Sequence, residues 1–175
     1  MIEFKPRIGL LSFSDGRKRV HEGLKAGIEA HQANIRAALE EIGAEVVLAG
    51  EVIYTPRMAV TQAKKLLGRD VAAVIFNIPV FAFPNLSVLA ANVLQKPVAI
   101  ASPGESHLPG MGGMLAAGGA IEQIGLQQQR IWGPLSEDKV QRQLEMFVRA
   151  AHAKHTLRGQ VYGQFGGRSI GMQTG

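Results

Sequence analysis

The sequence predicts an α/β domain of three layers, in which helices cover both faces of a parallel sheet. Short apolar runs of strand length alternate along the chain with longer segments whose apolar residues recur at helical spacing. The first run, RIGLLSF at residues 7–13, shows no polar alternation, which is typical of a strand buried on both faces. A chain of 175 residues, 46% of them hydrophobic, is long enough for one such domain with a sizeable core.

The first predicted helix follows this strand, from about Val20 to Ile42, and Gly43 is expected to end it. We expect His21 and His31, which fall within it, on the helix surface. The apolar side of the helix is formed by Leu24, Ile28, Ile35 and Leu39.

A second strand, AEVVLA at 44–49, precedes a helix that Thr55 caps and Pro56 opens, ending near Gly68. The third strand is AAVIFNI at 72–78. The later elements are a helix at 85–94, a strand at 97–102, a helix of small residues at 114–125, a short strand within 127–133, a helix at 136–155 and a final strand, QVYGQF, at 160–165.

Right-handed crossovers between these strands give a flavodoxin-like or Rossmann-like domain. In such a domain, ligands bind at the edge of the sheet where the carboxyl ends of the strands meet. The loops expected at this edge are SDGRKR, PVFAFPN and SPGESHLPGMGG.

The amino-acid composition limits the classes of function that this chain can have. The net charge is +5, but the basic residues are scattered and aromatic residues make up only 6%, so we do not expect a nucleic-acid partner. The absence of cysteine excludes thiolate chemistry and suits the cytoplasm. We find neither an apolar run of membrane-spanning length nor the layout of a signal peptide, so no membrane partner is expected.

In the loop SDGRKR, Arg17 could hold an anion or sugar hydroxyls through its planar donor fork, and Asp15 could cap the next helix or accept from a hydroxyl. The alternative is a solvated Asp-Gly turn. In PVFAFPN, Phe81 and Phe83 could stack on a sugar, pack against another subunit or simply close the core.

Three further features give no complete active site. Glu105 and His107 could act as base and acid, yet no third group orients the histidine. His152 and His155 have a metal-ligand spacing without a supporting carboxylate, so solvated histidines are favoured. The Gly/Ala run 112–120 does not match a phosphate loop and is expected to pack closely against a neighbouring element or subunit.

Four segments in order resemble the N-terminal domain of the L-fucose isomerase family, which is related to the L-arabinose isomerases. They are KPRIGLLSFSDGRKRVHE, FNIPVFAFPN, ESHLPGMGGMLAAGGA and VYGQFGGRSIGMQTG. The resemblance implies that residues 1–159 form the N-terminal domain. Residues 160–175 would then be the first strand and glycine turn of a second domain that is otherwise missing.

Family members interconvert aldoses and ketoses with a manganese-type ion, whose ligands lie in later domains. The resemblance therefore implies no metal ligand and no catalytic residue in this chain, which alone would be inactive. It further implies a homo-oligomer in which Arg17 and Phe81 contact a small sugar. Asp15, proposed above from the turn itself, is the third candidate for substrate binding. Where relatives carry tryptophan, Phe81 retains stacking but lacks the N–H donor. The alternative is a stand-alone flavodoxin-like sugar- or anion-binding or assembly module without catalysis.

Overall fold

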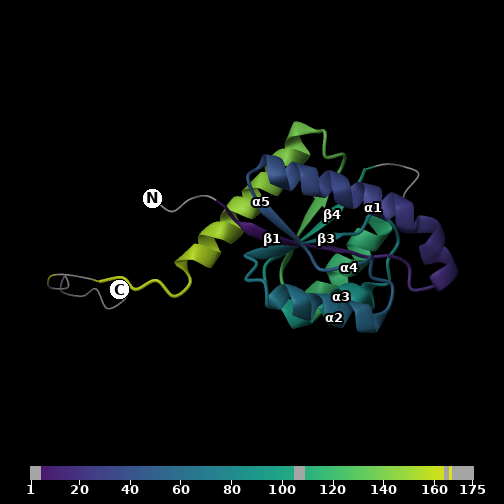
Figure 1. The fold of residues 1–175 in the computed structure, drawn as a ribbon, viewed down its shortest axis with the longest axis horizontal. Helices are drawn as coiled ribbons and strands as arrows, with labels where there is room; N and C mark the ends of the chain where they lie inside the picture. Colours follow the sequence, from purple (N-terminus) through teal and green to yellow (C-terminus); the bar gives the residue numbers. More distant parts are fainter. Residues whose placement is uncertain (1–4, 105–108, 164–165, 167–175) are drawn as a thin grey trace.

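The computed structural model describes residues 5–104, 109–163 and 166, in which five strands alternate with five helices (Figure 1). The strands are β1 (Arg7–Ser12), β2 (Glu45–Leu48), β3 (Ala73–Asn77), β4 (Val98–Ser102) and β5 (Gln128–Trp132). The helices are α1 (Lys18–Glu41), α2 (Pro56–Leu67), α3 (Pro84–Leu94), α4 (Gly110–Gln123) and α5 (Asp138–Leu157).

The strands form one parallel sheet in the order β2-β1-β3-β4-β5. This confirms the predicted flavodoxin-like α/β fold. After β2 the chain crosses to the other side of β1, so the strand order reverses between β1 and β3. The register at this place pairs Ser12 with Asn77 at the carboxyl ends of the two strands. A ligand crevice is expected outside this point, because the loops after β1 and β3 leave in opposite directions.

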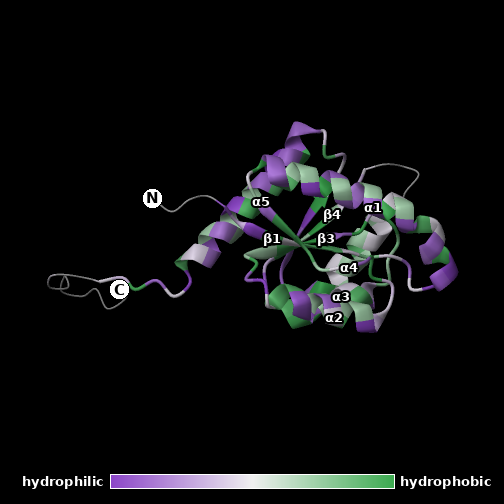
Figure 2. Ribbon diagram, viewed as in Figure 1, coloured by the Kyte–Doolittle hydropathy of each residue, from purple (hydrophilic) through white to green (hydrophobic). Residues whose placement is uncertain are grey.

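The two faces of the sheet are covered by different helices (Figure 1). Ala73 and Ile75 of β3 pack with α1 and α5, whereas Val74 and Phe76 pack with α2, α3 and α4. Figure 2 shows largely hydrophobic central strands between helices that alternate in hydropathy along their length. This is the pattern of helices that bury one side and expose the other.

Local signals set most of the boundaries. The backbone N–H of Met58 donates to the Thr55 hydroxyl over 3.3 Å, so Thr55 caps α2 as predicted, with Pro56 as its first residue. Gly43, with φ of 91°, follows α1 and ends it.

Helix α4 begins at Gly110, earlier than the predicted start at Met114. Glycines lower helix propensity, yet here they allow the helix to approach its neighbours. Gly113 lies against the carbonyl oxygen of Val80, where any side chain would collide. The predicted close packing of the Gly/Ala run against a neighbouring element is therefore confirmed, and the neighbour is the segment after β3.

The predicted final strand is wrong for residues 160–163, and residues 164–165 lie outside the described residues. Gly159, with φ of 78°, turns the chain after α5, and the chain then leads away from the sheet (Figure 1). Val161 and Tyr162 are exposed, and none of the described strands pairs with them. An apolar alternation does not form a strand without a neighbour to accept its hydrogen bonds.

Candidate functional site at the carboxyl edge of the sheet

The loops after β1 and β3 meet at the carboxyl edge of the sheet. The ring of Phe83 lies directly on Gly16, and a Cβ added at Gly16 would be 2.8 Å from its Cδ2. The ring of Phe81 lies near Gly112 in the first turn of α4. The structure therefore brings the predicted loops together, with Phe83 as the contact between the first two.

Arg17 and Asp15 form one unit. The guanidinium of Arg17 donates from Nε to Asp15 Oδ1 over 2.9 Å and from Nη2 to Oδ2 over 2.7 Å. The backbone N–H of Arg17 also donates to Oδ1 over 2.9 Å. The carboxylate therefore accepts three hydrogen bonds from one residue, which fixes both the turn and the direction of the arginine side chain.

This pair is buried at one end and open at the other. The Asp15 side chain is 4% exposed, whereas that of Arg17 is 68% exposed. The hydrogen bonds from the Arg17 side chain lower the pKa of Asp15, although burial opposes this effect. The same hydrogen bonds raise the pKa of Arg17. Asp15 is not the side-chain cap of α1, because its carboxylate binds the residue that precedes the helix.

Phe81 and Phe83 stay accessible beside this pair. Their exposed fractions are 43% and 38%, and the rings meet edge to face with centroids 6.5 Å apart. Neither ring closes the core, which was one of the interpretations open from the sequence. On α4, whose first turn Phe81 approaches at Gly112, Met111 and Leu115 are also exposed.

Beneath the loops, a buried polar network joins α1 to the two central strands. The Asn77 amide nitrogen donates to Ser12 Oγ over 2.8 Å and to the Ile28 carbonyl over 3.1 Å. Ser12 Oγ donates to Gln32 Oε1 over 2.6 Å. Because the amide oxygen of Asn77 faces His31 Nδ1 at 2.7 Å, this ring nitrogen is the donor. The network fixes α1 above the point where the strand order reverses.

The expectation that His21 and His31 lie on the helix surface is wrong, since both are buried. His21 stacks on Tyr54 with ring centroids 4.2 Å apart. Burial lowers the pKa of His21, and Lys25 lowers it further, so His21 is neutral at ordinary pH. The helical period contained the signal, because both histidines continue the stripe of Ile28 and Ile35.

Among residues 5–104, 109–163 and 166, no three potential ligands gather as a metal ion requires. His155 Nε2 lies 3.7 Å from Asp70 Oδ1, so it faces a carboxylate that the sequence analysis did not connect with it. Glu105 and His107 lie outside the described residues. The described residues therefore do not fit a manganese site.

No helix in the described part of the chain combines the length and the apolar character needed to cross a membrane.

Comparison with known proteins gives one family. The family model for the L-fucose isomerase first N-terminal domain matches residues 5–159. Comparison with curated proteins gives no match. Among solved structures, the chain is similar to an ABC transporter substrate-binding protein from Sphaerobacter thermophilus, at 16% identity and a TM-score of 0.38. That match covers 86% of this chain but only 53% of the other, and the likeness is too low to carry an argument.

The family model spans most of the chain, including the DGR turn and the loop after β3. The family suggested by the sequence motifs is thereby confirmed. The chain belongs to the family of the L-fucose isomerase first N-terminal domain.

Proposed function

We propose that this chain is the substrate-contacting and oligomer-forming N-terminal domain of a metal-dependent aldose–ketose isomerase of the L-fucose type. Membership of the family supports the reaction class. The observation that carries the site assignment is the buried carboxylate of Asp15, which holds the exposed guanidinium of Arg17 at the carboxyl edge.

The pairing with Asp15 preorganises the Arg17 side chain to bind uncharged hydroxyl groups. A guanidinium has five N–H donors, and the hydrogen bonds to Asp15 use only two of them. The remaining donors face outward on a side chain whose direction is already fixed. Because Asp15 supplies the counter-charge, the site can accept an uncharged sugar without leaving a cation unpaired. Binding then orders fewer side-chain rotamers than a free arginine would require.

Phe81 supplies the apolar contact that sugar binding needs in addition to hydrogen bonds. Its exposed ring offers an apolar surface to the C–H face of a pyranose or open-chain sugar. Phe83 meets it edge to face and rests on Gly16, so the aromatic pair and the arginine are held on connected loops. An exposed aromatic pair beside a helix on which Met111 and Leu115 are also exposed suits contact with a second subunit.

In this proposal the metal belongs to residues outside the described part of the chain. The Mn²⁺ ion would supply the charge stabilisation for the proton transfer, as divalent ions do in such chemistry. The role of this domain is to bind and orient the sugar. The isolated chain should therefore bind sugar weakly and should not isomerise it.

The test is Arg17→Ala in the enzyme expressed from the whole gene, with L-fucose as the first substrate. Loss of a charged hydrogen-bond donor costs about 1.5–3 kcal/mol, so we expect KM to rise by roughly tenfold or more while the fold is kept. Arg19→Ala is the matched control, because Arg19 is also exposed on the first turn of α1. An unchanged KM in Arg17→Ala, or an equal rise in both variants, contradicts the assignment.

A further inference from the structure

A second hollow lies at the opposite edge of the sheet. Its volume is about 540 Å³, within the range of small-molecule sites. Ala72, Pro97 and Gln127 line it, and each directly precedes a strand, namely β3, β4 and β5. The hollow is therefore at the amino edge, separated from Arg17 by the length of the strands.

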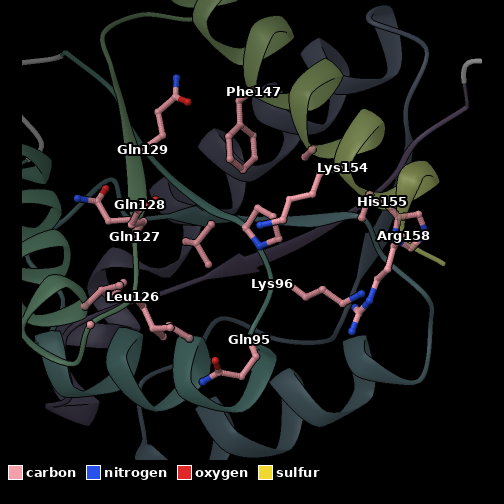
Figure 3. Close-up of a pocket in the computed structure, with 17 residues that line it drawn as sticks. Gln95, Lys96, Leu126, Gln127, Gln128, Gln129, Phe147, Lys154, His155 and Arg158 are labelled. Atoms are coloured by element: carbon pink, nitrogen blue, oxygen red, sulfur yellow. The ribbon is translucent and has the colours of Figure 1, made fainter. Parts of the chain in front are cut away.

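Three cationic side chains line this hollow. Lys96 comes from the turn after α3, and Lys154 and Arg158 come from the end of α5. Figure 3 shows Lys96 and Arg158 extending toward one another. The described lining residues include no aspartate and no glutamate. Like charges that converge without a counter-ion repel, so this arrangement favours a bound anion.

The nearby carboxylates are already engaged. Asp70 lies 3.7 Å from His155, which also lines the hollow. Glu122 accepts from Arg130 over 3.0 Å and from Gln128 over 2.7 Å. Within the described part of the chain, no carboxylate pairs with Lys96, Lys154 or Arg158.

The rest of the lining suits the organic part of a ligand. Exposed amides of Gln127 and Gln129 stand on the side across from the cations (Figure 3). Amides can donate to and accept from hydroxyl groups. Apolar contacts are offered by Val98, Ile121, Leu126 and Phe147.

From these observations we infer that the amino-edge hollow binds a small phosphorylated metabolite. Its phosphate lies between Lys96 and Arg158, and its hydroxyl-bearing part faces the glutamines. A phosphate is favoured over a carboxylate because two converging cations match its double charge, and the arginine fork matches its oxygens. This site shares no residue with the proposed sugar contact at Arg17 and does not depend on it.

The experiment is a calorimetric titration of the 175-residue chain at low ionic strength with ribose 5-phosphate, with ribose as the uncharged probe and pyrophosphate as the bare anion. We expect saturable binding of ribose 5-phosphate and of pyrophosphate, and none of ribose. The double variant Lys96→Gln, Arg158→Gln should weaken this binding at least tenfold. Amide NMR shifts on titration should centre on Lys96, Gln127 and His155.

Arg57→Gln is the matched control, because it removes the same charge as Arg158→Gln from an exposed position at the amino end of α2. The single variant Arg158→Gln is measured beside it and should weaken binding of ribose 5-phosphate more than Arg57→Gln does. Equal weakening by these two single variants would show attraction to net charge and overturn the site. Absence of saturation up to about 10 mM ribose 5-phosphate would also overturn it. If the double variant Lys96→Gln, Arg158→Gln does not fold, the single variant Arg158→Gln alone is compared with Arg57→Gln, because Arg158 is exposed.

Discussion

The ring of Phe83 lies on the α-carbon of Gly16, with two ring atoms within 3.0 Å of the place where a methyl group would stand. This contact joins the loop after β3 to the turn that carries Arg17. The position of the proposed sugar-binding arginine therefore depends on a glycine and an aromatic ring as well as on its own ion pair.

We expect Gly16→Ala to displace the Phe83 ring and to lower the free energy of unfolding by about 1–2 kcal/mol, measured by urea denaturation. The control is Gly23→Ala in α1, where no atom lies near the added methyl group. That variant should gain about 0.5–1 kcal/mol from better helix propensity. Adding Phe83→Ala to Gly16→Ala should relieve the steric conflict. Equal free energies of unfolding for Gly16→Ala and Gly23→Ala would contradict the contact between Phe83 and Gly16.

Asn77→Ala should be among the costly polar substitutions in this chain. It leaves the Ile28 carbonyl and His31 Nδ1 without the partner they have now, in a buried site. The expected loss is about 3 kcal/mol by urea denaturation, from the buried hydrogen bonds that are lost together with the cavity. Asn34→Ala, on the exposed side of α1, is the control and should change stability by less than about 0.5 kcal/mol. A small effect of Asn77→Ala would mean that the network is dispensable.

Protonation of His21 should lower the free energy of unfolding in mild acid. Its pKa is lowered from 6.5 in the folded protein, so the unfolded chain takes up the proton first as pH falls. Stability is therefore lost from about pH 6.5 downward, until the folded-state pKa is passed. The charged groups around the ring are Lys25, Glu22, Glu29 and Glu51.

His21→Phe should flatten this part of the stability–pH profile while keeping a ring against Tyr54. His31 is present in both proteins, so its contribution cancels in the comparison. Denaturation midpoints measured between about pH 7 and pH 5 test this directly. Parallel profiles for the two proteins would contradict the assignment to His21.

Asp15 should contribute in the same sense at lower pH, because its pKa is also lowered in the folded protein. Its pKa is lowered from 3.8, so its stabilising effect is complete above that value and is lost as pH falls through the folded-state pKa. Asp15→Asn removes the charge with little change in shape. The difference in urea midpoint between wild type and Asp15→Asn should be largest near neutral pH and should shrink below pH 3.8. A difference that does not depend on pH would show that the charge of Asp15 has no role.

Much of the fold could be predicted, because its signals are local. Buried parallel strands read as continuous apolar runs, and all five described strands were predicted to within one residue at each end. The cap at Thr55 and the stop at Gly43 depend on chemistry within a few residues. The early start of α4 and the missing strand after α5 depend instead on what lies nearby in space.

The site was less predictable, because its parts are joined by tertiary contacts. Asp15 and Arg17 are two residues apart, so both could be proposed, although their hydrogen-bonded pairing was not. Asn77 stood within an apolar run, and only the pairing of β3 with β1 brings it to Ser12. The amino-edge hollow draws its cations from two separate segments, a combination that helical or strand spacing does not reveal.

The hydrogen bond between His31 and Asn77 has a mechanical consequence for the edge of the sheet. It fixes the rotation of α1 about its own axis at a point about four helical turns beyond Arg17. A one-residue slip of the helix would turn it by about 100° and swing the Asp15–Arg17 turn away from Phe83. The direction of the Arg17 side chain therefore depends on a buried contact in the middle of α1. A substitution that breaks this contact would change the orientation of an exposed side chain at the sheet edge.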